Sequence, residues 1–224
     1  MNTDHSTSER VVSARPSGIV LGGSAVVMAV FMAMHPRPHS HELLDLVTQL
    51  TNEAGFNGFV HGVLMATLAA AMAGLLGLGD ALGFGAMLVR AGLLSFCCGG
   101  VMGMLAAAIN GFVLPAVVSR RVGDAPEVIE KLRPLMSLCL EGNRVLSQMM
   151  VVGVSAGVLL LSVALVRRAH GRGLGILGIV CASLPLAALV AGRLPMSVHG
   201  FGAFVLLQVV WYLAVATQMI RGRI

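Results

Sequence analysis

Charged residues are scarce in this sequence, since Asp, Glu, Lys and Arg together make up 11% of its 224 residues. Soluble domains carry about 25% charged residues, and disordered chains are poor in apolar ones, whereas this chain is 57% hydrophobic. These proportions exclude an ordinary soluble domain and a disordered chain. The net charge is +5, but the basic residues are scattered between apolar blocks and form no basic patch. The sequence therefore predicts no nucleic-acid partner.

Several motifs that carry chemistry are also missing. The four cysteines form no CxxC pair, so the sequence predicts no structural disulfide. It contains no Gly-Lys-Ser/Thr element for a phosphate loop and no His-Glu-x-x-His metal spacing. The string Gly153-Val-Ser155-Ala-Gly157 matches Gly-x-Ser-x-Gly, but it lies inside an apolar helix, where the strand-turn-helix context of a nucleophile elbow is lacking.

The sequence does have six apolar stretches that are long enough to cross a bilayer, which takes about 20 residues. The first is too long for a signal-peptide core and lacks a small-x-small cleavage site, so we expect a retained span. The expected fold is an all-α integral membrane protein, a six-helix bundle built as three hairpins between the tails 1–16 and 221–224. The expected spans are 17–35, 58–79, 92–114, 143–166, 173–192 and 197–220.

Basic residues in the connections indicate the orientation of these spans. Arg167 and Arg168 occupy one short connection, and Arg221 and Arg223 occupy the C-terminal tail. Because arginine and lysine favour the cytoplasmic side, both termini are expected inside. The composition, rich in Arg, Ala and Gly, favours a bacterial inner membrane. The lipid bilayer is therefore the first expected partner, and a homo-oligomer or membrane partner subunits are further ones.

Two longer connections, 36–57 and 115–142, then lie outside. The first contains apolar residues at helical spacing from Leu43 to Leu50. The second contains Asp124-Ala-Pro-Glu127, which is typical of a helix start. We expect both to form short interfacial helices. The preceding span is expected to end at Pro115, because proline commonly follows a helix end.

Small residues are frequent within the spans, as at Gly74, Gly99 and Gly103. Helix backbones approach each other closely in lipid where such residues meet, so the sequence predicts a tightly packed bundle.

Most polar residues of the spans lie toward the outer side. Such residues usually face the bundle interior or a wet cavity, so they predict a polar pocket that opens outward. The residues concerned are His35, His61, Asn110, Asn143, Ser147, Gln148, Ser197 and His199.

Two similar strings place a histidine near the outer end of a span. Val60-His61-Gly62 opens the second span, and Val198-His199-Gly200 opens the sixth. Two imidazoles at one depth, each beside a glycine, are an arrangement that suits the axial ligands of haem b. His61 and His199 are therefore the candidate cofactor ligands, with a redox or electron-transfer role. The alternative is that both side chains only form hydrogen bonds to neighbouring helices.

A transition metal such as Cu or Zn is the other cofactor that the sequence suggests. Imidazole is the commonest metal ligand, and methionine thioethers add affinity for copper. The chain contains 14 methionines, which are also common gap fillers in apolar cores. The candidate metal ligands are His35, His39, His41, His61 and His199.

Two further function classes stay open. The first is an intramembrane hydrolase, since the layout of six spans with Ser155 on the fourth and His199 on the sixth resembles that of the rhomboid proteases. The sequence departs from that family where Ala156 follows the serine and where Met65 stands four residues after His61. The second is a non-catalytic membrane scaffold or accessory subunit of a larger complex.

Overall fold

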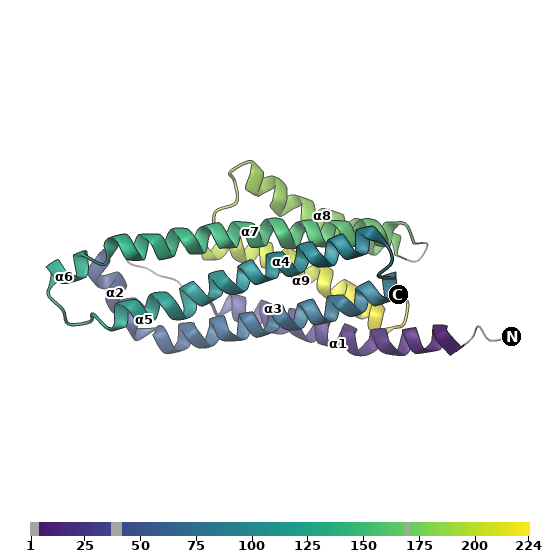
Figure 1. The fold of residues 1–224 in the computed structure, drawn as a ribbon, viewed down its shortest axis with the longest axis horizontal. Helices are drawn as coiled ribbons and strands as arrows, with labels where there is room; N and C mark the ends of the chain where they lie inside the picture. The colour runs from purple at the N-terminus through teal and green to yellow at the C-terminus, as the bar shows by residue number, and fades with distance from the viewer. Residues whose placement is uncertain (1–4, 37–41, 169–170) are drawn as a thin grey trace.

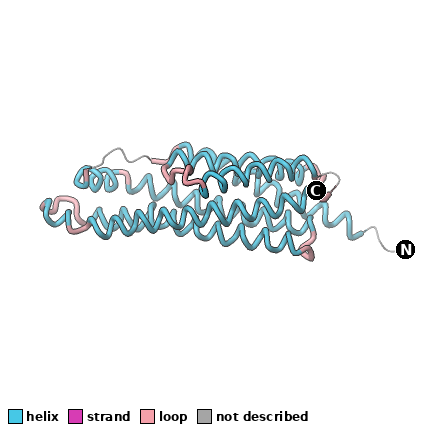
Figure 2. Tube along the Cα trace, turned by 90° about the horizontal axis from the view of Figure 1, so that it is seen from above, coloured by secondary structure: helices cyan, strands magenta, loops and turns pink. Residues whose placement is uncertain are grey.

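The computed structural model describes residues 5–36, 42–168 and 171–224, with side chains described from residue 14 onward. All regular structure in these ranges is helical, and none of it is a strand (Figure 1, Figure 2). The helices are α1 (His5–Ala33), α2 (Leu43–Asn52), α3 (Ala54–Leu82), α4 (Met87–Ala108), the π-helical turn η1 (Ile109–Val113), α5 (Leu114–Ser119), α6 (Pro126–Glu130), α7 (Arg133–Val166), α8 (Arg172–Val190) and α9 (Val198–Ile220).

Six helical stretches among these residues are long and apolar enough to cross a membrane, which fits a multi-pass membrane protein. A helix is the element expected there, because a bilayer offers no water to the backbone polar groups and a helix satisfies them internally. The stretches are Ala14–Ala33, Ala54–Leu82, Met87–Ser119, Pro126–Val166, Arg172–Val190 and Val198–Ile220.

The six long helices close a ring. Each of α1, α3, α4, α7 and α8 packs against the next long helix along the chain, and α9 packs back against α1. The start of α1 and the end of α9 consequently lie at the same end of the bundle (Figure 1). In this ring α1 stands between α3 and α9, which are therefore not direct neighbours.

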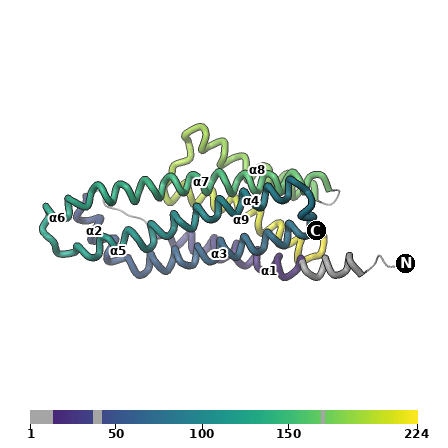
Figure 3. The backbone as a smooth tube through the Cα atoms, in the orientation of Figure 1, coloured from purple at the N-terminus to yellow at the C-terminus, as the bar shows by residue number. Residues whose placement is uncertain are grey.

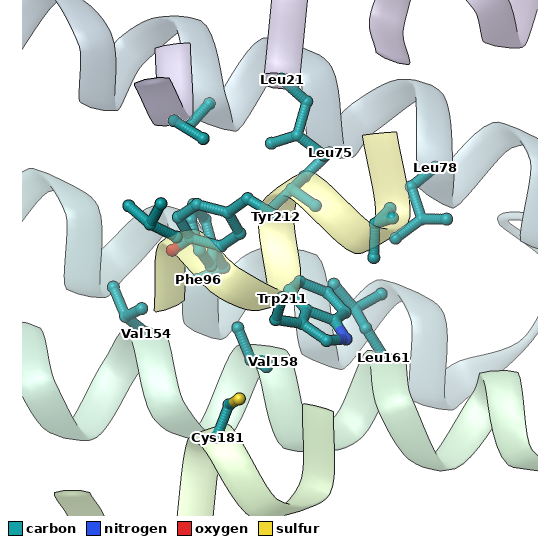
Figure 4. Close-up of a cluster of buried hydrophobic side chains, with 14 of the residues drawn as sticks. Leu21, Leu75, Leu78, Phe96, Val154, Val158, Leu161, Cys181, Trp211 and Tyr212 are labelled. Carbon is teal, nitrogen blue, oxygen red and sulfur yellow. The ribbon is translucent and has the colours of Figure 1, made fainter. Parts of the chain in front are cut away.

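The single tryptophan and the single tyrosine of the chain lie in the core of this ring. Trp211 and Tyr212 of α9 are almost fully buried, and the Tyr212 ring meets Phe96 of α4 edge-on with centroids 5.9 Å apart. Leucines and valines of α1, α3 and α7 complete the cluster (Figure 4). Because edge-to-face pairs add to the energy of apolar burial, this cluster fixes how α4 and α9 face each other.

Glycine sets the closest approach in the bundle, between α4 and α7. A methyl group built on Gly99 would lie 2.5 Å from the backbone nitrogen of Val154, and one built on Gly153 would lie 2.6 Å from Cα of Gly99. The Ser95 hydroxyl donates a hydrogen bond across this contact to the carbonyl oxygen of Gly153, at 3.0 Å. The two helices therefore touch backbone to backbone.

A cap of short helices covers the end of the bundle away from the termini (Figure 3). At about 1.5 Å per residue, α7 is roughly 51 Å long, well beyond a hydrocarbon core of about 30 Å. Its first turns carry the cap, in which α2 packs against α5 and α6. The apolar face of α2 packs into the interior of this cap. The cap has its own cluster of buried side chains: Val47, Leu114, Val118, Ile129 and Met136.

The helix that contains Pro115 corrects one expectation from the sequence. It continues past Pro115 to Ser119, because a π-helical turn precedes the proline. Within that turn the backbone N–H of Leu114 donates to the carbonyl oxygen of Ile109, five residues back. Pro115 has no N–H to offer, so the carbonyl oxygen of Asn110 is left free for a partner outside the helix.

Candidate metal centre

A cavity of about 120 Å³ lies inside the bundle, just below the cap. Its wall is formed by the end of α1, the first turns of α3 and α9, the end of α4 with η1, and the middle of α7. The space suffices for several waters or for one ion. Among the described residues that line it none is charged, and the polar ones are His35, His61, Asn110, Asn143, Ser147 and Ser197.

His35 and His61 meet in this cavity with their Nε2 atoms 3.2 Å apart. Nδ1 of His61 lies 2.9 Å from the carbonyl oxygen of Asn57, and Nδ1 of His35 lies 2.8 Å from that of Pro36. A carbonyl oxygen only accepts, so each Nδ1 carries the ring hydrogen and donates it. In a neutral imidazole Nε2 then has only a lone pair, and the two lone pairs face one another.

The position of His61 is fixed by the π-helical turn. The side chain of Asn110 donates an N–H to Nε2 of His61 at 3.2 Å. Gly111, the next residue, lies so close that a methyl group on it would be 2.4 Å from Cβ of His61. π-helical turns are rare and frequently occur at functional sites. This one directs the side chain of Asn110 toward the His61 imidazole.

A second hydrogen bond joins α3 to the same turn. Asn57 is buried, and its side chain donates to the free carbonyl oxygen of Asn110 at 2.9 Å. Asn57 therefore binds both Asn110 and His61, because its own backbone carbonyl oxygen accepts a hydrogen bond from the His61 ring. The missing N–H of Pro115 is thus linked, through Asn110 and Asn57, to the orientation of His61.

The predicted site residues are only partly brought together. His35 and His61 are in contact, with ring centroids 4.7 Å apart. His199 is exposed at the start of α9 and does not line the cavity, although Ser197 and Val198 beside it do. The reason is the rotation of α9 about its axis, since Val198, Phe201 and Val205 form the face that lines the cavity and His199 lies on another side of the helix. His39 and His41 lie outside the described residues.

Ser155 and His199, the residues of the hydrolase hypothesis, are not joined. Ser155 is fully buried in α7, and its hydroxyl has no hydrogen-bond partner among the described residues. His199 is exposed. A serine nucleophile is activated by a general base within hydrogen-bond reach, and no such hydrogen bond to Ser155 is present among the described residues.

Sequence reasoning missed two features of the site. It did not identify Asn57, although Asn57 stands four residues before His61 and so shares its helix face. It considered methionine as a copper ligand, but it did not identify Met65, Met104 and Met150 among the six methionines that line the cavity, which are Met28, Met32, Met65, Met104, Met150 and Met196. Met28, Met32 and His35 recur at helical spacing, as do His61 and Met65.

Carboxylates and cysteines contribute no further ligand. Among the described residues, no group of three or more His, Cys, Asp or Glu side chains is placed to hold a metal ion. Among the described residues of the cavity wall, the donors beyond the two imidazoles are amides, hydroxyls and thioethers. No family model, curated protein or solved structure matches the chain.

Gly111→Ala is expected to displace His61 and weaken metal binding. The added methyl would overlap Cβ and Cγ of His61, at 2.4 and 2.7 Å. Since changes to residues that orient a ligand cost about 10–100-fold in affinity, we expect a loss of this size in a metal titration. Gly62→Ala is the control, because its methyl would meet only Phe112, at 3.7 Å. Equal affinities in the two variants would show that the contact does not position His61.

Proposed function

We propose that this chain is a membrane protein that binds one transition-metal ion between His35 and His61, in a cavity that opens to the outer side. The observation that carries the proposal is the pair of Nε2 atoms 3.2 Å apart, each ring having its hydrogen on the opposite nitrogen. Two unprotonated nitrogens this close together are stabilised by an N–H donor or a cation beside them. Asn110 supplies a donor to His61, whereas a cation could serve both nitrogens. Neutral imidazole nitrogen is the commonest metal donor.

The spacing suits two ligands of one ion. If the ion lay about 2.0–2.1 Å from each nitrogen, a separation of 3.2 Å would correspond to an angle at the metal of about 100–106°. That angle is close to tetrahedral. By contrast, the two axial ligands of a haem lie on opposite sides of the iron, with nitrogens about 4 Å apart. The geometry therefore favours a bare ion over haem.

The hydrogen bonds around the pair support the same function. Metal-ligating imidazoles usually donate their other N–H to a carbonyl or carboxylate, which fixes the orientation of the ring. Both imidazoles have such a partner, Asn57 for His61 and Pro36 for His35. This arrangement leaves Nε2 of both rings without a hydrogen. Nε2 of His61 accepts an N–H from Asn110 at 3.2 Å, so an ion bound there would take the place of this hydrogen bond.

Metal analysis of purified protein tests the proposal. After equilibrium dialysis against Cu(I), Zn(II) or Co(II) in detergent, the protein is expected to retain about one ion per chain for at least one of these metals. The visible spectrum of the same sample tests for haem. If no metal is retained in stoichiometric amount, the two imidazoles serve only to form hydrogen bonds with Pro36, Asn57 and Asn110. The histidines would then be structural, as in a membrane scaffold or accessory subunit.

The proposal includes an arrangement in the membrane. The six helices form three hairpins in a bacterial inner membrane, with both termini inside and with α2 and α6 at the outer interface. Two arginines support this: Arg168 follows the end of α7 and bonds to the end of α3, and Arg223 follows the end of α9. The end of α9 lies at the end of the bundle that carries the termini (Figure 1), where the positive-inside rule favours arginine. The cavity then faces the outer side.

Cysteine labelling is expected to confirm this orientation. In a variant without the four native cysteines, Asp124→Cys lies beside the cap and Arg223→Cys follows α9. A membrane-impermeant maleimide added to intact cells should label position 124 only, and position 223 only after permeabilisation. Labelling of 223 but not 124 in intact cells would reverse the orientation, and the cavity would open inward.

A further inference from the structure

We infer that the ion taken by this site is monovalent and soft, namely Cu(I), with Ag(I) as its analogue. The inference rests on the proposed function, because it names the ion for the same pair of histidines. Two independent properties of the cavity wall lead to it: the chemistry of its donor atoms and the absence of any anionic group among its described lining residues.

The donor atoms are imidazoles and thioethers. Six of the chain's fourteen methionines line this one cavity, and they come from α1, α3, α4, α7 and the segment before α9. Imidazole suits zinc, copper, iron and nickel, whereas thioether selects Cu(I). Copper is the metal that both donor types favour.

The positions of three methionines place them beside the imidazoles. Met65 lies four residues after His61 in α3, so these two share a helix face. Met32 of α1 lies three residues before His35, and both line the cavity. Met150 of α7 faces them from another side of the cavity, with its sulfur packed against Gly103. The absence of a side chain at Gly103 makes room for this sulfur.

Charge gives the second argument. The cost of moving an ion into a medium of low dielectric grows with the square of its charge, so a divalent ion needs anionic ligands far more than a monovalent one does. Neither an acidic residue nor a cysteine lines the cavity among the described residues. A wall of neutral donors consequently suits a single positive charge.

The lining residues of the cavity furthest from the cap are apolar and buried. Leu68 and Val205 are buried lining residues, and they belong to the same packed core as Phe96, Trp211 and Tyr212, which Figure 4 shows. An ion held by His35 and His61 is therefore expected to exchange through the end of the bundle that carries the cap.

A competition titration tests the inference. Full-length protein in detergent, with ascorbate present, competes for Cu(I) with a chromogenic Cu(I) chelator, and parallel titrations use Ag(I) and Zn(II). We expect one Cu(I) or Ag(I) per chain and weaker binding of Zn(II). The triple variant Met32→Leu, Met65→Leu and Met150→Leu keeps apolar volume, and it should lower the Cu(I) affinity at least about tenfold.

A matched control uses three methionines outside the cavity. Met34, Met87 and Met149 are exposed, so their joint replacement by leucine should leave Cu(I) affinity unchanged. Zn(II) bound as tightly as Cu(I), or equal Cu(I) affinity in both triple variants, would overturn this inference while the histidine site still stood. If neither metal binds at all, the inference and the proposed function both fail.

Discussion

Replacing His61 with alanine is expected to abolish stoichiometric metal binding. The change removes one of two imidazoles whose Nε2 atoms are 3.2 Å apart, and it leaves the side-chain N–H of Asn110 without its acceptor. Loss of a residue that only orients a ligand costs about 10–100-fold in affinity, so loss of the ligand itself should cost at least about 100-fold. Isothermal or chelator-competition titration measures this, and His35→Ala should give the same result.

His199→Ala is the matched control for both variants. His199 is exposed and lies off the cavity wall, so its removal should change neither affinity nor stoichiometry. His61→Gln, which keeps volume and hydrogen-bonding capacity, separates loss of a ligand from loss of the fold. If His199→Ala abolished binding while His35→Ala did not, the pair expected from the sequence would be the functional one, and the pair seen in the structure would not be.

The difference between these two pairs shows what the sequence predicts and what it does not. The depth of His61 and of His199 follows from the distance of each to the end of its span, at about 1.5 Å per residue. Which helices are neighbours does not follow from span lengths. The packing of α1 against both α3 and α9 brings His35, at the end of α1, to His61.

The π-helical turn is a second feature that periodicity does not predict. A proline near the end of an apolar stretch predicts a helix end, and Pro115 was interpreted in this way. Inside a packed bundle the helix instead continues, because one turn widens and the freed carbonyl oxygen of Asn110 finds the side chain of Asn57. The partner that makes this continuation favourable lies 53 residues away in the chain, so it is visible only in the fold.

Other features were accessible from composition alone. A scarcity of charge and six long apolar stretches predicted an all-helical protein suited to a membrane, and the structure has six helices that fit this description among its described residues. The frequency of glycine predicted close packing, but not that Gly99 and Gly153 would be the pair in contact. Pairing depends on the rotation of each helix about its axis, which a helix rich in apolar residues on all sides does not specify.

Gly99→Leu is expected to prevent folding of the bundle. Even the first carbon of a side chain there would lie 2.5 Å from the backbone nitrogen of Val154, and backbone cannot move aside as a flexible side chain does. Inserting single methylenes into a packed core costs about 1–3 kcal/mol, and leucine adds several. We expect aggregation instead of a monodisperse peak in size-exclusion chromatography of the detergent-solubilised variant. Gly23→Leu is the control, because Gly23 has open space around it.

The alanine variants make this prediction quantitative. Gly99→Ala and Gly153→Ala should each lower the free energy of unfolding by about 1–3 kcal/mol, because each added methyl would overlap the backbone of the facing helix. Both helices also carry the cavity wall, through Met104 on α4 and Met150 on α7. Forcing these helices apart should therefore widen the cavity and weaken metal binding in any variant that still folds. A Gly99→Ala protein as stable as Gly23→Ala would show that α4 and α7 do not touch backbone to backbone.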